Sequence, residues 1–468
     1  MRSLTFVVRK NNKNMKLLIT RNKVKDISKS IADFFSESEI TKLGKETGFI
    51  KRVRKLTAKT FLNMLVIGSE PSGSGMSLSQ MVVTLSRQDV YMKDPSLSER
   101  FTKQAEAFMK GAFEIVLTKS LSSTPVLQTL EGFTEVRIQD STTIKLPDAL
   151  KGHFPGTSGV CSKSSMKLDF QQDLKSGAMK FEVRTGVMND ATAEMGTIKS
   201  GSLWLRDLGY FSSNSLKRIA EGGAYYVSRL KCSSNIYALK SDNQPIDIKE
   251  IGKKMKENEI VEMEVYIGDK DRIPTRLILQ KVPSAEASRR KKKLTKHKKR
   301  KGKKMSKQRL EWCEFNVMIT NVCKKTYGGQ AVFNLYKIRW SIEIIFKVWK
   351  SIFQIEKIST PNKERLMCQL YGKLIYIILN QKLFAILKAA AWNNWKIDLS
   401  EIKVFKAMVE LKSEWQAALI SNSVKKYENY IIILCKVIKI IGEKHVRKKK
   451  KNQLLHLSDS AHHEPISA

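Results

Sequence analysis

The hydrophobic and polar positions along the chain change period near residue 130. Between about residues 26 and 120 the apolar residues recur at the spacing of amphipathic helices. From about Gly132 apolar and polar residues alternate, which is typical of half-buried strands. We therefore predict a helical N-terminal region over residues 1–120 and the first part of an α/β core over residues 130–234. A basic cluster at 51–59 predicts that the N-terminal region binds DNA.

Two of the predicted strands end in an aspartate. The alternating stretch 136–140 ends near Asp140, and the alternating stretch 203–207 ends at Asp207. A helix that begins at Ser212 or Ser213 and a further strand follow the second stretch. An ordinary acid in a turn at a strand end is the simpler interpretation of each aspartate.

Alternation at 261–267 and 277–279 predicts an all-β insertion over residues 235–315. Within it, Arg289–Arg309 holds 14 Lys or Arg in 21 residues. We expect this run to be a loop that is disordered when free, and to bind phosphates generally rather than to read a base sequence.

The chain returns to the core after this insertion. A strand VMITNV at Val317–Val322, a helix and a long apolar helix predict the second half of the core over residues 316–395. Residues 396–468 are predicted to be a helical C-terminal region with a basic tail.

The predicted helix LYKIRWSIEIIFKVWK places Tyr336, Arg339, Glu343 and Lys350 within roughly 60° of arc, with Lys347 beside them. Apolar residues occupy the opposite side: Ile338, Ile342, Ile345 and Trp349. One acid in a row of cations suits metal and phosphate chemistry. The alternative is a solvated helix face with ion pairs between neighbouring turns.

The charge of the chain favours a polyanionic partner. Its 468 residues include 85 Lys and Arg against 45 Asp and Glu, a formal net charge of +40. Such an excess attracts nucleic acid with a steep dependence on salt. A codon bias that favours Lys, Ile and Asn is the alternative explanation.

The composition does not favour a disulfide-bonded protein, a protein with a histidine or cysteine metal site, or a membrane protein. Six scattered cysteines without a C-x-x-C pair predict reduced thiols in a cytoplasmic protein. The six histidines show no metal-ligand spacing. Polar residues interrupt every apolar run before the roughly 18 residues of a membrane span, so we expect no membrane contact.

Four motifs in order resemble those of bacterial DDE transposases of the insertion-sequence-four family. The first two are Asp-Ser-Thr at 140–142 and Asp-x-Gly-Tyr-Phe at 207–211. Ile-Thr-Asn at 319–321 and the Tyr-x2-Arg-x3-Glu-x6-Lys spacing from Tyr336 follow. The resemblance covers roughly residues 45–395. One departure is Leu208, which stands where many relatives carry arginine.

The resemblance implies an RNase H-like catalytic core interrupted by the all-β insertion. It implies cut-and-paste transposition: water hydrolyses the transposon end, and the released 3′-hydroxyl attacks target DNA without a covalent protein intermediate. Asp140, Asp207 and Glu343 would be the catalytic residues and the ligands of two Mg²⁺ ions, for which Mn²⁺ can substitute.

The resemblance also implies DNA contacts. Tyr336 and Arg339 would hold a phosphate and a flipped nucleotide, and Lys350 a backbone phosphate. Lys347 lies outside the motif but is predicted to bind DNA as well. Trp312 is either a base-stacking residue or, as its apolar surroundings favour, part of the core.

The implied partners are the terminal inverted repeats, target DNA and a second copy of the chain in a homodimeric synaptic complex. The expected location is the bacterial cytoplasm, in association with the nucleoid when DNA is bound. The alternative function is a non-catalytic DNA-binding protein derived from a transposase. An RNase H-like RNA nuclease would leave the Tyr336, Arg339 and Lys350 row unexplained.

Overall fold

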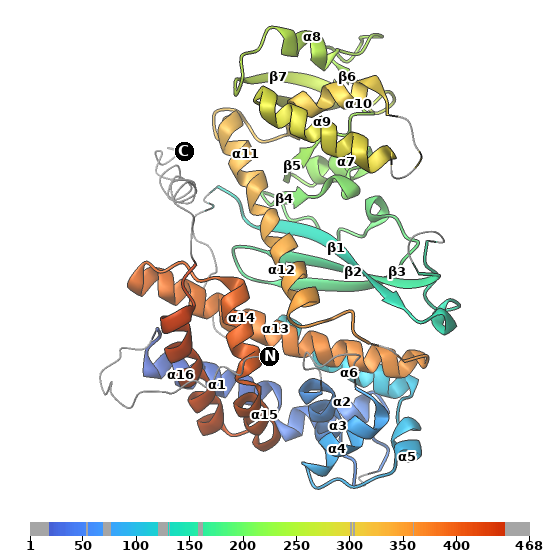
Figure 1. The fold of residues 1–468 in the computed structure, drawn as a ribbon, viewed down its shortest axis with the longest axis vertical. Helices are drawn as coiled ribbons and strands as arrows, with labels where there is room; N and C mark the ends of the chain where they lie inside the picture. Colours follow the sequence, from blue (N-terminus) through green and yellow to red (C-terminus); the bar gives the residue numbers. More distant parts are fainter. Residues whose placement is uncertain are drawn as a thin grey trace. The chain divides into compact units, whose positions relative to one another are not determined.

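The computed structural model describes residues 18–444 except for 53–54, 69–75, 120–129, 131, 158–161, 300–301, 303–304 and 359. Its residues form two compact units (Figure 1). One unit is helical and lies within Met1–Thr124 and Lys347–Val446, and the other is an α/β unit within Pro125–Phe346. The predicted basic tail and the first residues of the N-terminal region lie outside the described residues.

The helical unit confirms the prediction of helical regions towards both ends of the chain. Its helices are α1 (Arg21–Phe34), α2 (Glu37–Glu46), α3 (Ala58–Ile67), α4 (Leu78–Ser86), α5 (Asp94–Ser98), α6 (Lys103–Thr118), α13 (Lys363–Trp395), α14 (Glu401–Glu410), α15 (Lys412–Ser421) and α16 (Val424–Ile441). The hydroxyl groups of Thr20, Ser36 and Thr57 accept hydrogen bonds from backbone N–H groups at the starts of α1, α2 and α3. These caps satisfy donors that a helix cannot satisfy itself.

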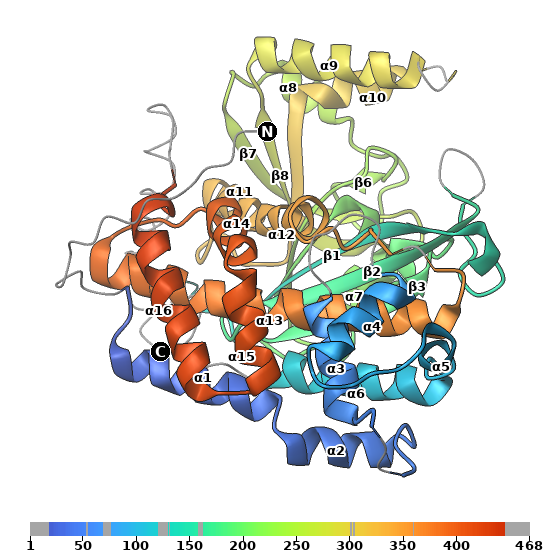
Figure 2. The same cartoon turned by 60° about the horizontal axis from the view of Figure 1, so that its bottom comes forward.

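Helix α13 is the core of the helical unit and packs against α3, α6 and α14 (Figure 2). Among the described helices it is the one long and apolar enough to cross a membrane, but 67% of its most apolar stretch is buried inside the protein. Polar residues such as Asn380 and Gln381 interrupt this stretch and are buried with it. The stretch is therefore a buried helix of the helical unit, whereas the sequence placed it in the second half of the α/β core.

The α/β unit contains one sheet of nine described strands in the order β3-β2-β1-β4-β5-β9-β8-β7-β6. The strands are β1 (Val136–Leu146), β2 (Ser164–Asp173), β3 (Met179–Thr185), β4 (Leu203–Arg206), β5 (Tyr225–Arg229), β6 (Ile236–Tyr237), β7 (Ile260–Ile267), β8 (Ile273–Lys281) and β9 (Phe315–Thr320). The helices are α7 (Ser213–Glu221), α8 (Ile248–Lys253), α9 (Ser284–Lys299), α10 (Lys307–Glu311) and α11 (Gly329–Ile338). Helix α12 (Trp340–Ser351) begins in this unit and continues into the helical unit.

The register of the central strands sets the position of the two predicted aspartates. Strand β1 runs antiparallel to β2 and parallel to β4, and β4 runs parallel to β5. All four residues of β4 are buried, as expected for a strand with neighbours on both sides and cover on both faces. We predicted that the first strand ends near Asp140, but β1 continues to Leu146 because its pairing with β2 extends that far.

Residues 235–315 do not form the all-β insertion that we predicted. This segment contains the helices α8, α9 and α10 as well as the strands β6, β7 and β8. Strand β8 pairs with β9, so the strands extend the same sheet as the core rather than forming a separate one.

The prediction of a basic loop at 289–309 is also wrong for the first part of the run, which belongs to α9. Glu286 pairs with Arg289 and Arg290 across one turn of this helix, a spacing that favours helix. Lys291 binds Glu314, and Arg290 donates a 2.9 Å hydrogen bond to the side chain of Asn316, so the helix is held on the sheet.

The single helix predicted around Tyr336 and Glu343 is two helices, α11 and α12, with Arg339 at their junction. The N–H of Arg339 donates to the carbonyl of Tyr336, and the N–H of Ile342 donates to the carbonyl of Arg339. These three-residue hydrogen bonds tighten the backbone there. Tyr336 and Arg339 are buried rather than presented on a solvated face.

The Ile-Thr-Asn motif joins β9 to β5. The side chain of Asn321 accepts a hydrogen bond from the N–H of Tyr226 and donates one to the carbonyl of Ala224, both at 2.8 Å. The hydroxyl of Thr320 donates to the carbonyl of Tyr226 at 2.7 Å. These side chains continue the strand pairing where the backbone pairing ends, and α11 follows from there.

We predict that Asn321→Ala lowers the free energy of unfolding by about 2–3 kcal/mol, because it leaves a backbone donor and a backbone acceptor without partners. Urea unfolding followed by circular dichroism measures this change. The control is Asn334→Ala on α11, whose contacts are to Gln330 and Lys337 on the exposed surface of the same helix. Equal stability of the two variants would show that the motif does not hold the strands.

Candidate active site

Three acidic side chains of the α/β unit surround the guanidinium group of one arginine. Nη2 of Arg339 lies 2.6 Å from Oε1 of Glu343 and 3.7 Å from Oδ1 of Asp207. Nη1 of Arg339 lies 3.6 Å from Oδ2 of Asp140. The arginine side chain is 5% exposed, whereas the Glu343 side chain is 44% exposed. The structure thus brings together the three acids and the arginine that the sequence motifs predicted.

Neighbouring parallel strands place the two aspartates. Gln139 on β1 pairs with Arg206 on β4, and Asp140 and Asp207 follow these two residues. Oδ1 of Asp140 accepts a 2.8 Å hydrogen bond from the N–H of Ser141. Asp207 lies just beyond β4 and caps the short 3-10 turn η3 (Leu208–Tyr210).

The tight junction of α11 and α12 places the remaining groups. Glu343 is one turn after Arg339, so the two side chains meet across that turn. The guanidinium carbon of Arg339 lies 5.3 Å from the centre of the Tyr336 ring. The hydroxyl of Tyr336 lies 3.5 Å from the carbonyl oxygen of Arg206, the residue before Asp207.

The acids affect one another's ionisation. Burial, together with repulsion from Asp207 and Glu343, raises the pKa of Asp140 from 3.8 to about 6, against the opposing effects of the Ser141 N–H and Arg339. Burial alone would lower the pKa of Arg339, but Tyr336 and the nearby carboxylates outweigh it and raise the pKa above its usual value. The guanidinium therefore remains charged and offsets the repulsion among the acids.

The donor chemistry of the three acids fits a hard divalent cation, because Mg²⁺ and Mn²⁺ prefer carboxylate oxygens. Within the described part of the chain, no three acidic, histidine or cysteine side chains are placed so that they could hold a metal ion as they stand. The reason at this site is geometric: the Arg339 guanidinium lies between the carboxylates. The chemistry of these side chains fits a metal ion, and the Arg339 guanidinium lies among them in this structure.

A pocket of about 690 Å³ adjoins the Tyr336 side of the site. Aromatic and cationic side chains line it together: Trp312, Phe333, Tyr336, Trp340, Arg229 and Lys337. Trp340 is 62% exposed. Trp312 is partly buried against the core cluster of the sheet and also lines the pocket, so its position fits both of the roles considered for it from the sequence.

Lys347 and Lys350 lie further along α12, in the part that belongs to the helical unit. Lys347 is exposed, and Lys350 is partly buried. Their predicted contacts with DNA remain predictions.

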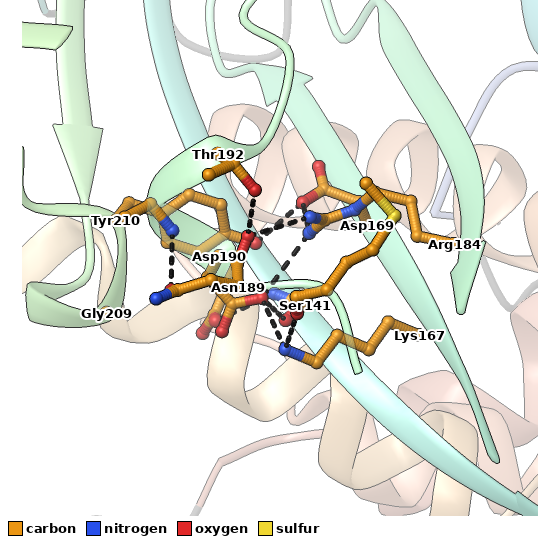
Figure 3. Close-up of polar contacts among 12 residues, drawn as sticks. Ser141, Lys167, Asp169, Arg184, Asn189, Asp190, Thr192, Gly209 and Tyr210 are labelled. Carbon is orange, nitrogen blue, oxygen red and sulfur yellow. Dashed lines mark hydrogen bonds and ion pairs between the residues drawn. The ribbon is translucent and has the colours of Figure 1, made fainter. Parts of the chain in front are cut away.

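A second group of polar residues in the α/β unit was not predicted from the sequence (Figure 3). The group consists of Ser141, Lys167, Asp169, Arg184, Asp190 and Tyr210. Asp190 lies in a short 3-10 turn, η2 (Asp190–Thr192). In the sequence, Asp169 occupies a polar position of the alternating stretch 166–170, so the pattern gave no signal of this group. The structure buries Asp169, and a charged side chain is rarely buried unless it is paired.

Comparisons with known proteins show the family of the chain. Residues 131–379 match the family described as "Transposase DDE domain". The chain is 32% identical to the "Transposase for insertion sequence element IS1151" of Clostridium perfringens, over 92% of this chain and 94% of that protein. It is 30% identical to the "Transposase for insertion sequence element IS231F" of Bacillus thuringiensis subsp. israelensis, over 81% of this chain and 83% of that protein.

A more distant relative extends the comparison. The "Putative transposase InsL for insertion sequence element IS186A" of Escherichia coli (strain K12) is 21% identical over 75% of this chain and 91% of that protein. The family match covers more than half of the chain, and the nearer relatives match along most of it. This chain therefore belongs to the DDE transposases.

Proposed function

We propose that this chain cuts the ends of an insertion sequence and joins them to target DNA, with Asp140, Asp207 and Glu343 as the catalytic acids. The observation that carries the proposal is the meeting of these three acids around Arg339. They come from strand β1, from the turn after the neighbouring strand β4 and from helix α12, far apart in the sequence. The strand order β3-β2-β1-β4-β5 supports the RNase H-like core that the resemblance to the insertion-sequence-four family implies.

DDE transposase domains generally depend on divalent metal ions. We propose that Asp140 binds two Mg²⁺ or Mn²⁺ ions and that Asp207 and Glu343 bind one each. Bound ions of this kind stabilise negative charge on the attacking and leaving oxygens of a phosphodiester. Asp140 suits the shared position because its side chain is the most buried of the three acids.

Arg339 would then leave the three carboxylates and bind a DNA phosphate. Its Nε and Nη1 atoms are buried without a hydrogen-bond acceptor among the described residues. A DNA phosphate would supply those acceptors, because guanidinium groups bind phosphates through two parallel hydrogen bonds. The arginine therefore neutralises the acids before DNA binds and the phosphate afterwards.

The adjoining pocket suits an unpaired nucleotide. Its rings at Trp312, Tyr336 and Trp340 offer stacking surfaces, and Arg229 and Lys337 offer positive charge at the same pocket. Stacking on aromatic rings and backbone contacts with cations are how proteins bind single-stranded nucleic acid. We assign the pocket to a nucleotide flipped out near the cleavage point.

A non-catalytic DNA-binding protein is the less favoured function. Loss of a catalytic acid would point to it, whereas all three acids are present and converge on one point. The partners we propose are the terminal inverted repeats, target DNA and a second copy of the chain in a homodimer. The proposed place of action is the bacterial cytoplasm, at the nucleoid.

We predict that Glu343→Gln reduces cleavage of a transposon-end duplex in Mg²⁺ by several orders of magnitude and leaves binding to that duplex unchanged. The amide keeps the shape of the side chain but removes the charge that a metal ion needs. Single-turnover cleavage assays and gel-shift titrations measure the two effects. The matched control is Glu264→Gln at an exposed position of β7. Normal cleavage by Glu343→Gln would refute the assignment.

Helix α9 supplies a second prediction, on DNA affinity. Its exposed cations include Lys292, Lys296 and Lys299. Replacing these three lysines by Gln should weaken binding to transposon-end DNA and to random DNA by similar factors. The slope of log affinity against log salt should flatten by up to about 0.9 for each DNA phosphate that one of these lysines neutralises.

The control for this experiment is Lys291→Gln, because Lys291 already binds Glu314 and we expect its replacement to change the salt slope little. Fluorescence anisotropy titrations at several salt concentrations give both slopes. A selective loss of transposon-end binding would mean that α9 reads sequence.

A further inference from the structure

The second polar group forms a buried network of balanced charge (Figure 3). Nη2 of Arg184 lies 2.7 Å from Oδ2 of Asp169 and 3.3 Å from Oδ1 of Asp190, and the side chains of Arg184 and Asp169 are each 2% exposed. Oδ1 of Asp190 also accepts hydrogen bonds from Oγ of Ser141 at 3.0 Å and Nζ of Lys167 at 3.1 Å. Two carboxylates therefore face two cations, and the network holds without an external ion.

Ser141 connects this network to the first acid. Its hydroxyl donates to Asp190, and its backbone N–H donates to Oδ1 of Asp140 at 2.8 Å. One residue thus binds both the network and the carboxylate of Asp140. The other oxygen of that carboxylate, Oδ2, faces Arg339.

Tyr210 connects the network to the second acid. Its hydroxyl donates a 2.7 Å hydrogen bond to Asp169, and the residue ends the turn η3 that Asp207 caps. Oδ2 of Asp207 accepts from the N–H of Gly209 at 3.3 Å. A methyl group placed on Gly209 would lie 3.6 Å from Oδ2 of Asp190 and 3.8 Å from Oδ2 of Asp207, so the network also borders this turn.

We infer that Ser141 and Tyr210 are positioning residues, which hold the first and second acids in place through the Asp190–Arg184–Asp169 network. The inference rests on the proposed function, in which Asp140 and Asp207 bind the same metal ions. Two carboxylates that repel each other need an external restraint if they are to stay together when Arg339 leaves. Polar partners behind metal-binding side chains provide such a restraint in other proteins.

The test compares Ser141→Ala with Ser141→Thr, which restores the hydroxyl. Mn²⁺ affinity is measured by titration calorimetry on the full chain bound to a transposon-end duplex that cannot be cleaved, so that a DNA phosphate is present to take Arg339, and the thermal unfolding midpoint is measured in chelator. We expect Ser141→Ala to weaken Mn²⁺ binding by about 10–100-fold, to leave the midpoint unchanged, and to be rescued by Ser141→Thr. Tyr210→Phe, which keeps the ring and removes the donor to Asp169, should weaken Mn²⁺ binding in the same direction.

Two further variants distinguish a failure of this inference from a failure of the proposed function. Thr143→Ala, an exposed position on the same strand, is the control and should bind Mn²⁺ as the unaltered chain does. Asp140→Asn should abolish the binding. Unchanged affinity in Ser141→Ala with loss in Asp140→Asn would overturn the inference alone, whereas unchanged affinity in both would overturn the proposed function. A loss in Ser141→Ala that Ser141→Thr does not recover, or that comes with a lower midpoint, would show a merely structural role and also overturn the inference.

Discussion

The repulsion among three carboxylates gathered at one point, offset by a single guanidinium group, is the constraint on which the site depends. Asp140 bears the largest electrostatic cost, because its burial beside two other acids favours the protonated form and raises its pKa to about 6. Arg339 lies within 3.7 Å of all three acids and makes their approach possible in the absence of metal. In the proposed function this cation leaves when a divalent ion takes its place, and the site would then have two states with different counterions.

The fold supplies the restraints that this balance needs. Parallel pairing of β1 with β4 brings Asp140 on β1 close to Asp207, which directly follows β4. The tight turn between α11 and α12 places Arg339 and Glu343 beside them. The side chain of Asn321 joins β9 to β5 just before α11 begins. The acids therefore come together through the architecture of the unit, despite their charge.

The sequence predicted the parts of the site that depend on local pattern. Strand alternation located Asp140 and Asp207, and the spacing around Glu343 located the helical part of the site. Local pattern could not show that the backbone tightens at Arg339, which divides the predicted helix and buries Tyr336. It also could not show that cations of α9 find partners such as Glu314, which hold the run as a helix on the sheet. The pairing of Asp169 with Arg184 and Tyr210 depends on the register of β2 with β3 and on a distant turn, neither of which a single sequence reveals.

The three acids are proposed to bind divalent metal in exchange for Arg339. Anomalous X-ray diffraction from crystals of the full chain grown with Mn²⁺ and transposon-end DNA tests this exchange most directly. We predict Mn²⁺ peaks within about 2.0–2.3 Å of carboxylate oxygens of Asp140, Asp207 and Glu343, with the Arg339 guanidinium turned to a DNA phosphate. Anomalous peaks elsewhere, with Arg339 still bound to the three carboxylates beside the DNA, would contradict it.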